Sequence, residues 1–136
     1  MENDLIKLTV PNKPDYVGVV RLTTSAIASR IGFNIEEIED IKVAIAEACI
    51  DALDKSEDLY IEYKVCLDKL AIYVKNVTED EKSSERSKEK ELGILIIKSL
   101  MDEVIFNDQG IEMIKIIEDG NKWLSKASMK QMVTVT

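Results

Sequence analysis

Strand and helix patterns follow one another along the first half of the chain. Strand-forming residues over 5–10 end at Pro11, which cannot donate a hydrogen bond to a sheet, so they predict a short first strand. Apolar positions then recur at helical spacing over 14–30 and over 34–53, which predicts two helices. The closely spaced apolar positions of the second helix indicate that it is largely buried.

The second half of the chain has the pattern of two hairpins with a helix between them. Residues alternate between apolar and polar over 59–74 around a turn at 68–69, and again over 104–117 around a turn at 107–110. Apolar residues at helical spacing predict a third helix over 92–101. This order favours an α+β fold, a two-layer sandwich in which helices cover one face of a mostly antiparallel sheet.

A strongly charged stretch separates the first hairpin from the third helix. Ten of the fourteen residues over 78–91 are charged and none is apolar, so the stretch cannot bury surface to offset the entropy lost on ordering. We predict a mobile, solvated loop there. The chain as a whole is predicted to form one domain over 1–120, followed by a tail over 121–136.

The composition narrows the class of partner. At 136 residues, of which 46% are hydrophobic, the chain is long enough for one core. A net charge of -8 and a pI near 4.7 disfavour nucleic acids and anionic membranes as partners, because both attract clustered Lys and Arg. The sequence has no apolar run of membrane-spanning length, and its acidic start is unlike a signal peptide. We therefore expect a cytoplasmic protein whose partners are proteins or small ligands.

The cysteines, the absence of histidine and the carboxylates limit the kinds of catalytic site that the chain can form. Cys49 and Cys66 lack the spacing of a metal site, and we expect reduced structural thiols. Because histidine is absent, schemes that need a histidine base are excluded and carboxylates remain for proton chemistry. On the second predicted helix, Glu47 and Asp51 lie one turn apart and project to one side. Such a pair suits a general base beside a magnesium ligand, and it equally suits a solvated acidic face.

Three segments carry a resemblance to a known family. They are PDYVGVVRLT over 14–23, IEDIKVAIAEAC over 38–49 and LMDEV over 100–104. They resemble the RsbW/SpoIIAB-type anti-sigma factors of the GHKL ATPase superfamily, and the likeness spans most of the predicted domain. It implies the GHKL ATPase (Bergerat) sandwich and a homodimer. It also implies capture of a sigma factor and phosphorylation of a serine in an anti-anti-sigma partner, with ATP and magnesium as cofactors.

The resemblance implies roles for particular residues. Glu47 matches the glutamate that acts as general base toward the serine hydroxyl, and Asp51 replaces the asparagine that holds magnesium. Asn76 and Thr78 replace the aspartate and the glycine of the adenine site. Arg21 matches an arginine that contacts both the sigma factor and the anti-anti-sigma protein, and its guanidinium suits bidentate binding of carboxylates.

Other positions of the family pattern predict a weaker ATP site. The family's lid corresponds to the charged stretch over 78–91, and its glycine-rich end, whose N–H groups cradle phosphates, retains only Gly93. Glu89 and Glu91 stand where phosphate charge is received, and Lys88 and Lys90 partly offset the repulsion that results. Glu112 replaces a threonine that lines the adenine pocket of the family.

Three hypotheses of function follow. In the leading one, the chain is an anti-sigma factor that sequesters an alternative sigma factor, is released by an anti-anti-sigma partner, and has weakened or lost ATP binding and kinase activity. The alternative is an active serine-protein kinase that phosphorylates the anti-anti-sigma factor with Mg-ATP, so the sequence leaves open whether the chain is an enzyme. The third is a partner-binding domain that has diverged from sigma factors.

Overall fold

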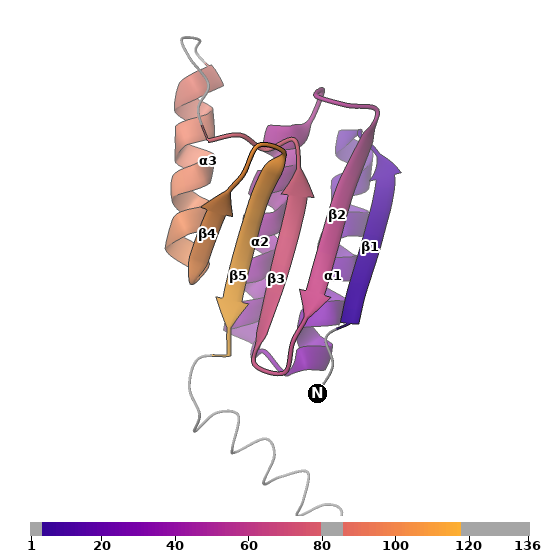
Figure 1. The fold of residues 1–136 in the computed structure, drawn as a ribbon, viewed down its shortest axis with the longest axis vertical. Helices are drawn as coiled ribbons and strands as arrows, with labels where there is room; N and C mark the ends of the chain where they lie inside the picture. The colour runs from indigo at the N-terminus through magenta and orange to yellow at the C-terminus, as the bar shows by residue number, and fades with distance from the viewer. Residues whose placement is uncertain (1–3, 80–85, 118–136) are drawn as a thin grey trace, which may run out of the picture.

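A five-stranded sheet with helices on one face makes up the computed structural model, which describes residues 4–79 and 86–117 (Figure 1). The strands are β1 (Asp4–Pro11), β2 (Asp58–Val65), β3 (Lys69–Lys75), β4 (Glu103–Phe106) and β5 (Gly110–Ile116). The helices are η1 (Pro14–Tyr16), which is a 3-10 turn, α1 (Val17–Ile31), α2 (Ile35–Ala52) and α3 (Arg86–Leu100). The strands lie in the order β1-β2-β3-β5-β4, and all four neighbouring pairs are antiparallel. The predicted α+β sandwich is confirmed.

Local sequence determines where α1 ends and α2 begins. Gly32 has φ 110, in the left-handed region that favours glycine, and its N–H donates to the carbonyls at the end of α1. Asn34 then caps α2. Its side-chain oxygen accepts from the N–H of Glu37 at 2.8 Å, and the Glu37 carboxylate accepts from the N–H of Asn34 at 2.8 Å. None of the helices in the described part of the chain is long and apolar enough to cross a membrane.

The core lies between the sheet and the pair α1 and α2, which stand behind the sheet in Figure 1. The side of α2 that faces this core is fully buried and consists of Ile41, Ala44, Ile45, Ala48 and Cys49. The hydroxyl groups of Thr24 on α1 and Tyr63 on β2 form a buried hydrogen bond of 2.7 Å. Burial raises the pKa of the Cys49 thiol to about 12, and both cysteines are free thiols, as expected.

Gly110 allows β5 to lie close to β3. A Cβ built on Gly110 would come within 2.2 Å of the carbonyl oxygen of Val74, which is closer than any atoms can approach without a shift of the backbone. In the preceding turn, the Asn107 side chain accepts from the N–H groups of Gln109 at 2.8 Å and Gly110 at 2.9 Å. These contacts place the β4–β5 hairpin next to β3.

The prediction of a loop over 78–91 is wrong in its last part. Helix α3 begins at Arg86, not near residue 92, so six residues of the charged stretch are helical. Lys and Glu are good helix formers, and a charged helix without an apolar period leaves no pattern for a sequence prediction to detect. The middle of the predicted loop, 80–85, and the predicted tail over 121–136 lie outside the described residues.

Candidate functional site

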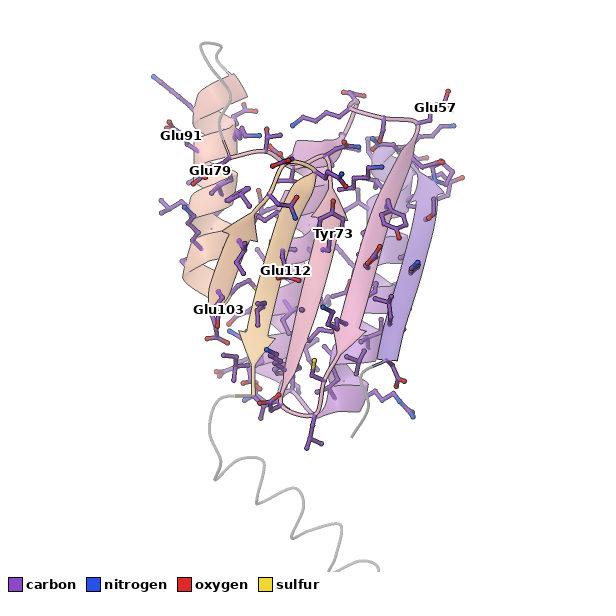
Figure 2. The ribbon with its side chains drawn as sticks, viewed as in Figure 1. Glu57, Tyr73, Glu79, Glu91, Glu103 and Glu112 are labelled. Atoms are coloured by element: carbon purple, nitrogen blue, oxygen red, sulfur yellow. The ribbon has the colours of Figure 1, made fainter. Side chains whose placement is uncertain are left out.

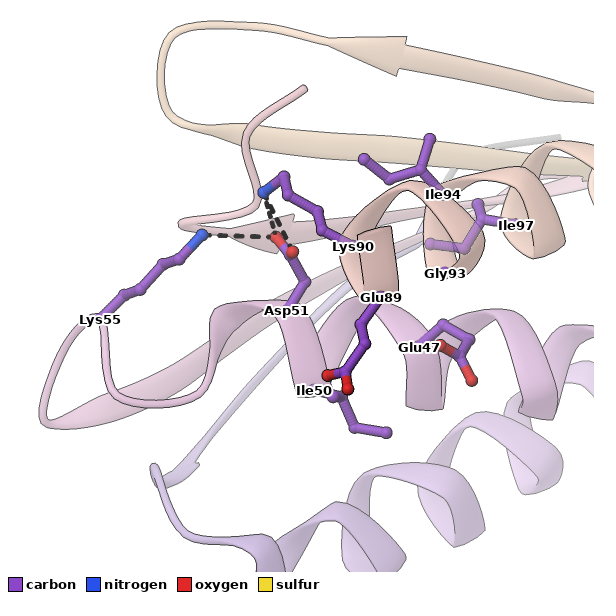
Figure 3. A pocket seen from close by; sticks show the side chains of 9 residues that line it. All are labelled: Glu47, Ile50, Asp51, Lys55, Glu89, Lys90, Gly93, Ile94 and Ile97. Atoms are coloured by element: carbon purple, nitrogen blue, oxygen red, sulfur yellow. Dashed lines mark hydrogen bonds and ion pairs between the residues drawn. The ribbon is translucent and has the colours of Figure 1, made fainter. Parts of the chain in front are cut away.

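A small pocket lies between the C-terminal half of α2 and the N-terminal half of α3 (Figure 3). Its volume is about 80 Å³. Its lining mixes carboxylates and lysines with isoleucines, and consists of Glu47, Ile50, Asp51, Lys55, Glu89, Lys90, Gly93, Ile94 and Ile97. Five of the residues that the sequence analysis named therefore lie at one place in the fold, namely Glu47, Asp51, Glu89, Lys90 and Gly93.

Asp51 is the centre of the polar contacts in this pocket. The ammonium group of Lys90 donates to both of its carboxylate oxygens, at 3.0 and 3.1 Å. Lys55 approaches the same carboxylate at 3.4 Å (Figure 3). The Lys90 ammonium also donates to the hydroxyl of Thr78 at 3.2 Å. Lys90 thus joins α3 to the end of α2 and to the segment after β3.

Gly93 permits a close approach of α3 to α2. A Cβ added there would lie 3.0 Å from a carboxylate oxygen of Glu47. Gly93 lies about two turns inside α3, because the helix already begins at Arg86. Only the first four N–H groups of a helix are without an intrahelical partner, so the N–H of Gly93 is not available to an anion. The phosphate cradle that the resemblance implies at Gly93 is absent from the described helix.

Thr78 and Asn76, the two expected adenine-site residues after β3, have different hydrogen-bond partners. Thr78 is tied to the pocket through Lys90. Asn76 has φ 70, a left-handed conformation that asparagine tolerates better than most residues, and its N–H donates to the carbonyl of Gln109 at 2.6 Å. Asn76 is not among the residues that line the pocket. Thr78 does not line the pocket either, and it is connected to the pocket only through its hydrogen bond with Lys90.

Glu112 lies far from this pocket in the fold. It is paired in register with Tyr73 on β3, and both side chains lie on the open face, the face of the sheet turned away from α1 and α2 (Figure 2). There it lines a separate hollow that also includes Ile105 of β4. The structure does not bring Glu112 together with Asp51, and its role at an adenine pocket stays a prediction.

Arg21, the expected partner-binding residue, lies on the outer side of α1. Its side chain is exposed, and so are those of two apolar neighbours, Val19 at 43% and Leu22 at 71%. Exposed apolar side chains next to an arginine are typical of protein interfaces. Neither Arg21 nor these two neighbours are among the residues that line the α2–α3 pocket.

The pocket, as it is arranged, fits neither a magnesium ion nor a nucleotide. Magnesium takes oxygen ligands in octahedral geometry, but both oxygens of Asp51 already accept from Lys90. Within the described residues, no three His, Cys, Asp or Glu side chains are grouped so that they could hold a metal. The volume of about 80 Å³ is also well below the roughly 300–1,000 Å³ that is usual for ligand pockets.

Sequence reasoning missed both cationic partners of Asp51. Lys55 follows Asp51 by four residues, but it lies beyond Ala52, where α2 ends, so helical spacing does not account for this contact. Lys90 had been assigned only a general effect on phosphate repulsion. It lies 39 residues from Asp51, and no local pattern connects the two.

Comparisons with known proteins agree with the fold. Residues 10–117 match the family model of the histidine kinase-like ATPase domain. The serine-protein kinase RsbW of Bacillus subtilis is 35% identical, over 79% of this chain and 81% of that protein. The RsbW of Bacillus pumilus is 37% identical, over 74% and 76%, and that of Listeria monocytogenes is 35% identical, over 82% and 85%. The chain therefore belongs to the RsbW family of serine-protein kinases, within the histidine kinase-like ATPase domains.

Proposed function

We propose that this chain is an anti-sigma factor that binds and sequesters an alternative sigma factor in the cytoplasm, as a homodimer, and that an anti-anti-sigma partner releases it. In this proposal ATP binding and kinase activity are weakened or lost. Partner exchange then follows relative affinities and concentrations instead of nucleotide state. Membership of the RsbW family supports the class of partner, and the α2–α3 pocket supports the loss of the nucleotide step.

The state of this pocket is the observation that carries the proposal. Three carboxylates, those of Glu47, Asp51 and Glu89, line a volume of about 80 Å³, and a triphosphate would add further negative charge. The N–H of Gly93 lies inside α3 and is not presented to a phosphate. A nucleotide would therefore have to displace Lys90 and also separate α3 from α2.

The partner surface in this proposal is the outer side of α1. Arg21 offers a guanidinium that binds carboxylates in a fixed geometry, and Val19 and Leu22 offer exposed apolar surface beside it. Arginine and apolar anchors contribute a large share of the binding energy in many interfaces. Because none of these three residues lines the pocket, sigma-factor binding in this proposal does not require a nucleotide to be present.

Binding measurements on the purified chain test the proposal. Alternative sigma factors from the same genome are titrated without nucleotide against the unchanged chain, Arg21→Ala and Arg30→Ala. Arg30 is the matched control, because it is an exposed arginine in the last turn of the same helix. We expect one sigma factor to bind, Arg21→Ala to weaken it by about tenfold or more, and Arg30→Ala to leave it unchanged. Capture of no sigma factor would contradict the proposal and favour a diverged partner-binding domain.

An active serine-protein kinase is the second candidate, and one observation favours it. Glu47, the general base that the resemblance implies, lines the pocket beside Gly93. A kinase would transfer phosphate from ATP to a serine of an anti-anti-sigma protein and would lose this activity in Glu47→Gln. The leading proposal predicts no transfer above background with either chain. Transfer that disappears in Glu47→Gln would replace the leading proposal with this one.

A further inference from the structure

The position of Asp51 near the C-terminus of α2 is electrostatically unfavourable unless a positive charge lies close by. Asp51 lies in the last turn of the helix, where the carbonyl ends of the peptide dipoles already give a partial negative charge. The last turn of α2 contains no basic residue that would balance it. An aspartate at such a position is unfavourable by itself, so its charge has to be balanced from outside the helix.

Lys90 supplies most of this balance. Its ammonium group contacts both oxygens of Asp51, at 3.0 and 3.1 Å, whereas Lys55 contacts one oxygen at the longer distance of 3.4 Å. The Lys90 side chain is only 5% exposed and the Asp51 side chain 11%, compared with 29% for Lys55. Because the Lys90–Asp51 pair is mostly buried, dissolved salt screens it much less than it screens an exposed ion pair. Separation of the pair would leave a poorly hydrated charge on each side.

The same contact holds the beginning of α3 in place. Among the described side chains over 88–92, Lys90 is the buried one, and the others are exposed. Apolar contact begins after these residues, with the half-buried Ile94, and the first fully buried apolar side chain is Ile97, which is 1% exposed. The first turns of α3 are therefore attached to α2 chiefly through a charge pair, and the later turns through apolar packing.

We propose that the ammonium group of Lys90 is a built-in cation of the α2–α3 pocket. It neutralises Asp51, fastens the start of α3 to α2 and to Thr78, and keeps the pocket closed to nucleotides and metal ions. A tethered ammonium is present at a high effective concentration, so an external cation competes with it poorly. This inference rests on the proposed function, because it names the group that closes the same pocket.

Lysine labelling of the intact chain tests this role directly. The folded protein is treated with an amine-acetylating reagent, and the rate at each lysine is followed by mass spectrometry. Lys88 is the internal control, since it is exposed and lies in the same helix. We expect Lys90 to react at least about tenfold more slowly than Lys88, because it reacts only when the pair opens. Equal rates for the two lysines would overturn the inference.

Variants of Asp51 and Lys90 complete the test. Asp51→Ala is expected to raise the labelling rate of Lys90 at least about fivefold, whereas Asp15→Ala, which removes an exposed carboxylate, leaves it unchanged. Lys90→Met, which keeps the length and removes the charge, is expected to speed hydrogen exchange in the first turns of α3, with Lys88→Met as the control. Unchanged labelling in Asp51→Ala, or unchanged exchange in Lys90→Met, would contradict the role of the pair.

These measurements use no partner protein and no nucleotide. The labelling result can therefore fail while sigma-factor capture succeeds, in which case sequestration stands and another contact closes the pocket. It can also succeed while no sigma factor binds, in which case the built-in cation stands and the proposed function does not.

Discussion

The two sides of α2 are built from different interactions. The side toward the sheet and α1 is dry and apolar, with Ile41, Ile45 and Cys49 fully buried. The side toward α3 carries Glu47 and Asp51, and it is joined to α3 by an ion pair at the edge of a pocket. One helix therefore serves both as the centre of the core and as the wall of the candidate site.

This contrast shows why a fold tolerates sequence change better than a charged site does. Apolar burial is not directional and scales with the area removed from water, so many combinations of residues preserve it. A charged site depends on individual groups at defined distances, so a change in one charged residue alters what it can bind. The chain accordingly keeps the fold of its RsbW relatives at about 35% identity, while its pocket is arranged around Lys90.

The largest expected effect is a loss of stability at alkaline pH, and it originates on the apolar side of α2, at Cys49. Burial raises the pKa of Cys49 from 9.0 to about 12, so the unfolded chain ionises first as the pH rises. The stability contributed by the neutral thiol is complete below pH 9.0 and is lost as the pH rises toward about 12. The loss is about 4 kcal/mol at the upper end. Urea unfolding across this window should give a shallower loss in Cys49→Ala, and equal slopes would show that the thiol is not buried.

Gly110→Ala is expected to have the next largest effect. Its Cβ would collide with the backbone of β3, which cannot move aside as a flexible side chain can. We expect a decrease of about 3 kcal/mol in the free energy of unfolding. Gly18→Ala is the control, because a Cβ at Gly18 has no atom within 4 Å and alanine favours the helix. Urea unfolding of both variants measures the difference, and equal stabilities would contradict the close approach of β5 to β3.

Gly93→Ala should have the smallest effect, although its Cβ also meets a neighbour. That neighbour is the carboxylate end of Glu47, at 3.0 Å, which can turn away toward solvent. The gain in helix propensity offsets part of the cost, and we expect a change within about 0.5 kcal/mol. Thermal unfolding measures it. A loss as large as that of Gly110→Ala would show that the α3 side of α2 is packed as tightly as the core.

Periodic patterns were sufficient to predict most of the fold. The second helix was expected over 34–53 and is found at Ile35–Ala52, because apolar spacing and the Asn34 cap both mark it. The start of α3 was missed for the opposite reason. Residues 86–91 have no apolar period, and the contact that holds them comes from Asp51 in a distant part of the chain.

The site was predictable only in part. Glu47 and Asp51 were found because helical spacing puts both on one side of α2. The pairing of Asp51 with Lys90 depends on how α3 packs, and no residue pattern encodes it. Glu112 illustrates a different limit. Successive side chains of a strand point to opposite faces of the sheet, so an error of one residue in an alignment places a side chain on the wrong face. Its position in a family alignment could not determine that it lies on the open face of the sheet.

Titration calorimetry with Mg-ATP tests most directly whether this chain has kept the scaffold of its family without the nucleotide step. The closed pocket, with Lys90 on Asp51, predicts no saturable heat up to millimolar nucleotide from the folded protein. Saturable binding in the micromolar range would contradict the account. It would show that α3 opens readily, and it would make phosphate transfer to an anti-anti-sigma partner the activity to measure next.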